Sequence, residues 1–221
     1  MILEFKNVTG NTRHFNLQNI NFSLEPGYIM GLAGKNGSGK SILMDYIMNP
    51  KQQYTGEILV NGRNIRDNHE QMMNAIGFVS DNNNSFLIEK SAKINAEIFG
   101  MLYENWEDRK FYDVMQKMNL SPGKIVGKMS RGEMFKFQTA FAMAHKSVLY
   151  LIDEATAGMD PVFRIDYFKI LQEIIAEEEA SILMTSHIQD EIYRKMDFVG
   201  IMEDGRLIEF GEALDFMERM L

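Results

Sequence analysis

The feature that most constrains this chain is the run Gly34-Lys35-Asn36-Gly37-Ser38-Gly39-Lys40-Ser41. It follows an apolar stretch at 28–33 that predicts a buried strand, and it leads into a helical pattern over 41–48. Glycines allow successive backbone N–H groups to turn inward, and a helix N-terminus adds its dipole, so such a loop attracts anions. The pattern G-x-x-x-x-G-K-[ST] between a strand and a helix therefore predicts a loop that binds the phosphates of a nucleotide.

The same pattern assigns individual roles. Lys40 is predicted to reach the β- and γ-phosphates, and the Ser41 hydroxyl is predicted to bind Mg²⁺. A dinucleotide-binding loop is disfavoured, because Ile42 stands where G-x-G-x-x-G requires its third glycine. The residues of this segment predicted to bind the nucleotide are Gly34, Asn36, Gly37, Ser38, Gly39, Lys40, Ser41 and Ile42.

Two carboxylates follow a second apolar strand pattern at 148–152. Asp153 and Glu154 stand at its end, and adjacent residues of a strand face opposite ways. We expect Asp153 to lie beside the metal bound by Ser41, and Glu154 to act as the general base for an attacking water. His187 closes the next predicted strand, at 181–185, and is expected to contact a γ-phosphate.

The remaining pattern predicts how the chain is organised. Short alternating runs at 2–5 and 20–24 predict an antiparallel layer, and Asn61-Gly62 and Asp204-Gly205 predict hairpin turns. Helical periodicity replaces the strand signal from about 91 to 144. One apolar helix face there is predicted to consist of Ile94, Ile98, Met101 and Leu102.

These elements together predict an α/β fold. Its P-loop NTPase core would contain a mainly parallel sheet, with an N-terminal antiparallel β layer and a helical sub-domain inserted over about 85–144. We expect residues 1–221 to form a single domain of this kind.

Composition excludes several classes of protein. The chain has no Cys, so it has neither a thiolate metal site nor a thiol nucleophile. Its net charge of −8 disfavours binding of nucleic acid through a basic face. No run of 18 apolar residues occurs, and the N-terminus lacks a signal-peptide pattern, so we expect a cytoplasmic protein.

Taken together, these motifs resemble those of the ATP-binding subunits of ABC transporters, over essentially the full chain. The segment Met129-Ser130-Arg131-Gly132-Glu133 looks like a variant of the L-S-G-G-Q signature of that family. The run from Asp153 to Pro161 is similar to its Walker B motif and D-loop, and His187 matches its switch histidine.

The resemblance implies ATP hydrolysis with ATP and Mg²⁺ as ligands. Two subunits of this family sandwich two ATP molecules head to tail, so the partner's nucleotide is expected at Ser130, Arg131, Gly132 and Glu133, and near Asp160. A homodimer is favoured, although a heterodimer is possible. The resemblance also implies an integral membrane permease as partner, no nucleic-acid partner, and a peripheral position on the inner face of the cell membrane.

The signature segment also has a structural interpretation that does not depend on the family. Ser130-x-x-Glu133 before an apolar helical pattern is a capping box. Glu133 departs from the family's Gln and brings negative charge toward the nucleotide. We therefore hypothesise that Arg131, which stands where the family has Gly, offsets the charge of Glu133.

Two further positions depart from the family pattern. Asp81 occupies the position of the Q-loop glutamine, and a carboxylate there can bind Mg²⁺ and orient water, so we expect retained activity with altered metal dependence. The aromatic residue that stacks on adenine in the family has no clear equivalent here. Phe15 is the best candidate, and packing of Phe15 in the core is an equally good interpretation.

The function predicted from the sequence is thus an ATP hydrolase that powers a transporter. The altered Q-loop and signature resemble those of small bacterial exporters of peptides or antimicrobial compounds, which favours export. The permease is expected to dock between the helical block and the core, near 81–89. The alternative is a non-transport ABC ATPase that acts as a soluble assembly or regulatory module. A P-loop kinase or GTPase would leave the signature and His187 unexplained.

Overall fold

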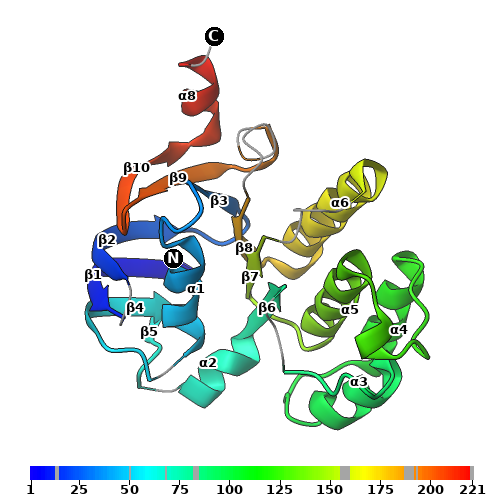
Figure 1. The fold of residues 1–221 in the computed structure, drawn as a ribbon. Helices are drawn as coiled ribbons and strands as arrows, with labels where there is room; N and C mark the ends of the chain where they lie inside the picture. Colours follow the sequence, from blue (N-terminus) through cyan, green and yellow to red (C-terminus); the bar gives the residue numbers. More distant parts are fainter. Residues whose placement is uncertain are drawn as a thin grey trace.

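Two β-sheets form the framework of the computed structural model shown in Figure 1. The structure describes residues 1–12, 15–49, 51–67, 69–81, 85–154, 160–186, 192 and 194–219, with the backbone alone at 161–162 and 177–178. The predicted α/β fold, with a mainly parallel sheet and an N-terminal antiparallel layer, is confirmed.

The smaller sheet has four strands, in the order β2-β1-β4-β5, and all its pairs are antiparallel. These strands are β1 (Leu3–Asn11), β2 (Asn16–Leu24), β4 (Tyr54–Val60) and β5 (Arg63–Asn64). The first two strands run further than the sequence predicted. Their pairing is interrupted by irregularities near Phe5 and Val8, which obscure the period-two pattern that marks a strand in sequence.

The larger sheet has six strands, in the order β10-β9-β3-β8-β7-β6. They are β3 (Ile29–Ala33), β6 (Ile76–Ser80), β7 (Leu149–Asp153), β8 (Ser181–Thr185), β9 (Phe198–Glu203) and β10 (Arg206–Glu212). All pairs are parallel except β9 with β10, which the predicted turn at Asp204-Gly205 joins. Every residue of β3, β7 and β8 is buried, as expected of parallel strands covered on both faces.

Helices cover the sheets on different sides. They are α1 (Lys40–Met48), α2 (His69–Ala75), α3 (Ala92–Gly100), α4 (Asp108–Lys117), the 3₁₀ turn η1 (Val126–Lys128), α5 (Arg131–Ala144), α6 (Pro161–Glu178) and α8 (Ala213–Glu218). Figure 1 shows α1 beside the four-stranded sheet, whereas α3, α4 and α5 lie on the opposite side of the molecule, beyond β6 and β7. The elements α3 to α5 form what we call the helical block.

Glycine allows α1 to pack closely on the small sheet. A Cβ atom at Gly10 in β1 would lie 2.3 Å from the Tyr46 hydroxyl of α1. Leu43, Tyr46 and Ile47 of α1 are fully buried in one cluster with β1 and β4. The helix that follows the glycine-rich loop is therefore anchored to both sheets, which fixes the loop at the carboxyl end of β3.

The apolar residues that indicated a helix at the start of the helical block are largely exposed. Ile94 and Ile98 are 38% and 39% exposed, and Met101 and Leu102 are 81% and 71% exposed, so this apolar face does not point into the core. The buried side of α3 consists of small or polar residues instead, namely Ala92, Asn95, Ala96 and Gly100. Close packing is the reason: the Cβ position of Gly100 lies 2.5 Å from the Trp106 ring, which leaves no room for a large side chain.

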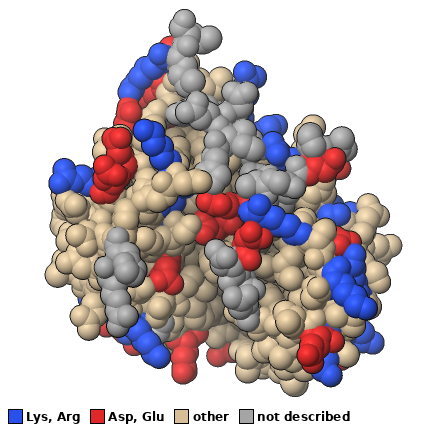
Figure 2. Space-filling model, viewed as in Figure 1, with Lys and Arg blue, Asp and Glu red and all other residues tan. Residues whose placement is uncertain are grey.

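Charged side chains are distributed unevenly over the surface. On the face shown in Figure 2, acidic side chains gather near the middle, and Lys and Arg side chains form separate groups rather than one continuous stripe. Within the described parts of the chain, no helix combines the length and the apolar character that crossing a membrane requires.

Candidate nucleotide-binding site

The glycine-rich loop joins β3 to α1. Gly37 and Gly39 have φ of 81° and 107°, in the left-handed region that favours glycine. A Cβ atom at Gly39 would also lie 2.6 Å from the ring of Phe15. The predicted loop therefore needs glycine at position 39 for two independent reasons, its backbone conformation and its packing.

Lys40 is a buried cation at the start of α1, only 4% exposed. Its Nζ atom donates hydrogen bonds to the carbonyl oxygens of Gly34 (2.8 Å) and Lys35 (3.1 Å). Burial lowers the pKa of Lys40, and the nearby carboxylates of Glu154 and Asp153 oppose that shift. An ammonium group held inside the loop by two neutral oxygens is well placed to exchange them for phosphate oxygens, which bind it more strongly.

Ser41 and Asp153 meet beside this loop. The Ser41 hydroxyl donates a hydrogen bond of 3.0 Å to the Asp153 carboxylate, which is only 7% exposed. The Thr185 hydroxyl donates to the same carboxylate oxygen at 2.7 Å. Mg²⁺ in proteins binds oxygen ligands, typically one or two carboxylates with waters and substrate phosphates. The hydroxyl and the carboxylate thus fit the predicted metal.

Glu154 stands at the tip of β7, next to Asp153. Its backbone N–H donates to the Thr185 hydroxyl at 2.9 Å, and its φ is 53°, a left-handed conformation that is unusual for a residue with a side chain. Such conformations cluster at functional sites, where the surrounding structure holds them. The structure therefore fixes the backbone of the predicted general base through the same threonine that contacts Asp153.

Two predicted parts of the site fall outside the described residues. His187 is one of them, and the D-loop segment at 155–159 is the other. Asp160, which follows that segment, directly precedes α6, and its side chain accepts a hydrogen bond of 3.2 Å from the Phe163 N–H. The structure thus gives Asp160 a capping role, and its contact with a partner's nucleotide stays a prediction.

The signature segment forms the predicted capping box at the N-terminus of α5. The Ser130 hydroxyl accepts from the Glu133 N–H at 3.3 Å, and the Glu133 carboxylate accepts from the Ser130 N–H at 2.9 Å. A Cβ atom at Gly132 would meet no atom within 4 Å among the described residues, so this turn has an open side.

Lys124 neutralises Glu133. Its Nζ atom donates to both carboxylate oxygens of Glu133 at 2.7 Å, and this hydrogen bond, with that from Ser130, lowers the pKa of Glu133. Arg131 instead contacts Asp81, with 3.0 Å between Nε and Oδ1. The hypothesis that Arg131 offsets the charge of Glu133 thus has no ion pair to support it, because Glu133 is paired with Lys124 and Arg131 with Asp81.

Two of the other predicted residues have contacts that leave their functional roles untested. Asp81 is engaged by Arg131, so its role as a metal ligand stays a prediction. Phe15 is partly buried and packs against Gly39 and the apolar cluster around α1, which supports the core-packing interpretation without testing adenine stacking. Ile42 also packs against this cluster.

A cavity of about 350 Å³ lies beside the loop. Gly34 to Ser38 line one side of it, and the β9–β10 turn lines the other. The Ser38 hydroxyl is buried and has no hydrogen-bond partner among the described residues. A buried hydroxyl of this kind is costly unless a ligand or water pairs with it, so the loop is suited to a polar ligand.

Sequence reasoning missed three residues that shape the site. Thr185 could have been found, because the carboxyl ends of neighbouring parallel strands lie at the same edge of a sheet. Gln138 is a polar residue among the apolar positions of α5, and it is only 1% exposed. Lys124 carries no such signal in the sequence, since its contact with Glu133 depends on how the preceding turn folds.

Comparison with known proteins agrees with the predicted family. The model of the ABC transporter family matches residues 17–157, which is more than half of the chain. The bacitracin transport ATP-binding protein BcrA of Bacillus licheniformis is 28% identical over 198 residues, covering 87% of this chain and 63% of BcrA. The methionine import ATP-binding protein MetN 1 of Pseudomonas fluorescens is 28% identical over 203 residues, covering 88% of this chain and 61% of MetN 1.

A solved structure supports the fold. An ATP-binding cassette, determined as a dimer in a post-hydrolysis state with ADP and Pi, has a TM-score of 0.82 at 18% identity. The alignment covers 96% of this chain and 98% of that structure. The chain spans less than two thirds of the length of BcrA and of MetN 1. With the phosphate loop, the Ser41–Asp153 pair and the capped signature turn, the family match shows that the chain belongs to the ABC transporter family.

Proposed function

We propose that the chain binds and hydrolyses ATP, and that it powers a membrane transporter by ATP-driven head-to-tail pairing with a second ABC ATPase subunit. The observation that carries this proposal is the hydrogen bond of 3.0 Å between Ser41 and Asp153. It joins the two oxygen donors that MgATP requires, directly beside Lys40 and next to Glu154 in the chain.

The phosphate groups of ATP would bind in the glycine-rich loop. Backbone N–H groups at the start of α1 face the site of an anion, and the helix dipole adds attraction there. The Lys40 ammonium would leave the carbonyl oxygens of Gly34 and Lys35 for β- and γ-phosphate oxygens. Because Lys40 is buried, this interaction would be screened less than one at the surface.

Ser41 and Asp153 are the residues that would hold Mg²⁺. When bound, the ion supplies neutralisation of the charge that develops on the phosphate oxygens. Thr185 orients the Asp153 carboxylate through its hydrogen bond of 2.7 Å. Asp81 was predicted from the sequence as a third ligand, and in that role its carboxylate would have to leave Arg131.

Hydrolysis would proceed by in-line attack of a water oxygen on the γ-phosphorus. The bond between the γ-phosphorus and the β–γ bridging oxygen breaks, and ADP and inorganic phosphate are released. Glu154 would take the proton of the attacking water as general base. His187 would donate a hydrogen bond to the γ-phosphate, in agreement with its position after β8.

The variant Glu154→Gln tests this proposal. Removing the base should block hydrolysis but not binding, so the ATP-bound pair should accumulate as a dimer in size-exclusion chromatography with MgATP. Glu57→Gln, a change of an exposed carboxylate in β4, is the matched control and should hydrolyse ATP normally. A Glu154→Gln protein that still hydrolyses ATP at the parent rate would contradict the assignment of the base.

The same experiment identifies the second subunit. We favour a homodimer, because one chain carries both the phosphate loop and the signature segment with its open side at Gly132. A Glu154→Gln protein that binds ATP but stays monomeric would favour a heterodimer with a different ATPase. In either case the bound ATP would lie between the loop of one subunit and Ser130 to Glu133 of the other.

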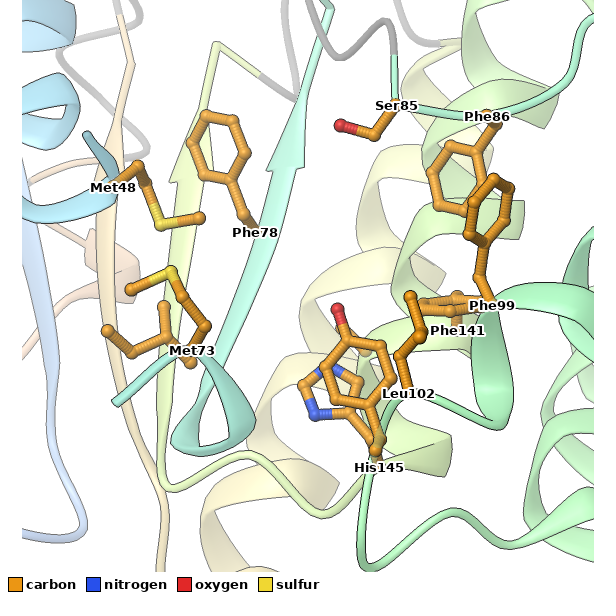
Figure 3. A pocket seen from close by; sticks show the side chains of 12 residues that line it. Met48, Met73, Phe78, Ser85, Phe86, Phe99, Leu102, Phe141 and His145 are labelled. Carbon is orange, nitrogen blue, oxygen red and sulfur yellow. The ribbon is translucent and has the colours of Figure 1, made fainter. Parts of the chain in front are cut away.

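A groove between the core and the helical block is our candidate for the permease contact. It has a volume of about 340 Å³. Figure 3 shows its two sides: Met48, Met73 and Phe78 come from the core. Facing them, from the helical block and the residues directly before and after it, are Phe86, Phe99, Leu102, Phe141 and His145. The methionines make one wall adaptable, since their side chains are unbranched and flexible.

The exposed apolar residues beside this groove support the same partner. Leu102, just after α3, lines the groove and is 71% exposed, and Ile88 before α3 is 62% exposed. Exposed apolar side chains that gather in this way mark a contact with another protein or a membrane. We propose that a short cytoplasmic helix of an integral membrane permease docks here. This contact would hold the chain on the inner face of the cell membrane.

Charge reversal beside the groove tests the docking site. Glu89→Lys should weaken co-purification with membrane proteins and uncouple transport while leaving ATP hydrolysis unchanged, because Glu89 is exposed and outside the nucleotide site. Glu57→Lys, on the small sheet, is the matched control. Lost hydrolysis with intact coupling would contradict the placement. Absence of any membrane partner for the parent chain would favour the non-transport ATPase.

The direction of transport is the most specific part of the proposal. BcrA is named for bacitracin transport and MetN 1 for methionine import, so the two relatives do not decide it. We propose export, on the resemblance of the altered Q-loop and signature to those of small bacterial exporters. Transport assays in inverted membrane vesicles, with the permease present, would distinguish the two directions.

A further inference from the structure

Two residues at which this chain departs from the family pattern contact each other. Asp81 stands where the family has Gln, directly after β6, and Arg131 stands where the signature has Gly, at the first residue of α5. Their Nε–Oδ1 distance is 3.0 Å, and the two side chains are 47% and 38% exposed. They are 50 positions apart in the sequence, so only the tertiary structure makes them partners.

A second, buried contact joins α5 to the end of β6 next to this ion pair. The Gln138 side chain donates to the Ser80 carbonyl oxygen at 2.9 Å and accepts from the Ser80 N–H at 2.8 Å. Gln138 lies about two turns after Arg131, so both residues are on one face of α5. The end of β6 is therefore attached to α5 at two levels, one buried and neutral, the other half-exposed and charged.

The residue of β6 that Gln138 contacts lies next to a candidate metal ligand. Ser80 is the register partner of Asp153 across the β6–β7 pair, and Asp153 accepts the hydrogen bond from Ser41. The first turn of α5 is thereby connected to the catalytic edge through adjacent strand ends. Movement of the signature segment relative to that edge must either carry Asp81 with it or break the ion pair.

Other contacts leave Arg131 suited to this role. Glu133 is neutralised by Lys124 rather than by Arg131. The Arg131 guanidinium also lies 5.9 Å from the centre of the Phe135 ring, one turn further along α5. It is thus held on its own helix by an aromatic ring while it reaches across to the strand.

We propose that Asp81 and Arg131 act as a matched pair in which Asp81 is a positioning residue for the signature segment, and not a metal ligand. The inference rests on the proposed ATP-driven pairing, since the signature would be positioned for the ATP of a partner subunit. The pair stays formed when two subunits close on ATP, and it keeps the first turn of α5 in a fixed position relative to the end of β6.

A double-mutant cycle in the Glu154→Gln background tests the pair. The measured quantity is the MgATP concentration that gives half of the protein as dimer. Asp81→Asn and Arg131→Gln should each raise it about twofold to fivefold, as expected for an ion pair of this exposure. The double variant should be no worse than either single one, and the swapped variant Asp81→Arg with Arg131→Asp should recover most of the loss. Added salt should reduce the difference between parent and Asp81→Asn.

The metal role is the outcome that would overturn the proposal. If Asp81 binds Mg²⁺, Asp81→Asn should raise the Mg²⁺ requirement equally with Arg or Gln at position 131, and the swapped variant should be the worst of the set. Additive effects of the two single changes would also overturn the pair.

A second measurement needs no dimer. In the nucleotide-free chain, amide hydrogen exchange at the first turn of α5 should be about twofold to fivefold faster in Asp81→Asn, and near the parent rate in the swapped variant. If the Glu154→Gln parent fails to pair with ATP while this exchange pattern holds, the proposed function fails and the ion pair stands. If exchange is unchanged in all variants, the pair does not position the segment.

Discussion

The nucleotide edge of the large sheet and the outer face of the helical block depart from the usual distribution of side chains in opposite ways. At the nucleotide edge, charged groups are buried: Lys40 is 4% exposed and Asp153 is 7% exposed. On α3, apolar groups are exposed, as at Ile98, which is 39% exposed. Buried charges and exposed apolar surface are both unfavourable in an isolated chain. Each region is therefore suited to a partner, polar in one case and apolar in the other.

The largest effect is expected at the buried cation. Lys40→Met should weaken ATP binding on the order of 100-fold, because two charge-assisted hydrogen bonds to phosphate are lost. Stability should stay equal or rise, since a buried charge is replaced by an apolar side chain of similar size. Nucleotide titration and urea unfolding of the same sample measure both. Lys51→Met, at an exposed position, is the control. A loss of stability without a loss of ATP binding would show that the buried charge of Lys40 serves the fold and not the nucleotide.

The second effect concerns His145 in the groove. It is 2% exposed and stacks on Tyr103 with 4.1 Å between ring centres, and burial lowers the pKa of His145 to about 4 from 6.5. Below pH 6.5 the unfolded chain binds a proton that the folded chain does not. The free energy of unfolding should therefore have its full value above pH 6.5. It should fall by about 3 kcal/mol as the pH approaches 4.

Urea unfolding across this pH range measures the effect of His145. His145→Gln should remove this part of the pH dependence, whereas the same change at His69 should leave it in place. An unchanged pH dependence in His145→Gln would show that another group causes the loss of stability in acid. His145, the only buried histidine among the described residues, would then not be its cause.

A smaller effect is expected at Thr185. Thr185→Val removes the hydroxyl that donates to Asp153 and accepts from the Glu154 N–H. We expect ATP turnover to fall about tenfold, since such supporting contacts orient metal ligands, and Thr185→Ser should recover most of it. Steady-state hydrolysis at varied Mg²⁺ measures the effect. If valine and serine behave alike, the hydroxyl does not support the site.

The smallest effect on stability is expected on α3. Ile98→Ser should change the free energy of unfolding by less than about 0.5 kcal/mol, as at other surface positions. Ala96→Leu, on the buried side of the same helix, should cost about 1–3 kcal/mol through overpacking. Urea unfolding compares the two. A loss of several kcal/mol of unfolding free energy in Ile98→Ser would mean that this face of α3 belongs to the core. Co-purification with membrane proteins should be lost in Ile98→Ser and kept in the parent.

Much of the nucleotide edge was predictable because its motifs are local. The spacing of glycines before Lys40 and Ser41, and the two carboxylates after an apolar strand, determine chemistry within a few residues of each other. The capping box at Ser130 and Glu133 was predictable for the same reason, since a helix terminus is satisfied by side chains three positions apart. The hairpin turns at Asn61-Gly62 and Asp204-Gly205 follow from the left-handed backbone that such turns require.

The sequence by itself thus determined the fold class, the phosphate loop and the residues at the strand ends. Only the tertiary structure decided which face of α3 is exposed, that Lys124 neutralises Glu133, and that Asp81 contacts Arg131. The reason is physical. A period of 3.6 residues identifies an apolar face but not what covers it, and an ion pair between distant positions depends on how strands and helices are brought together rather than on spacing along the chain.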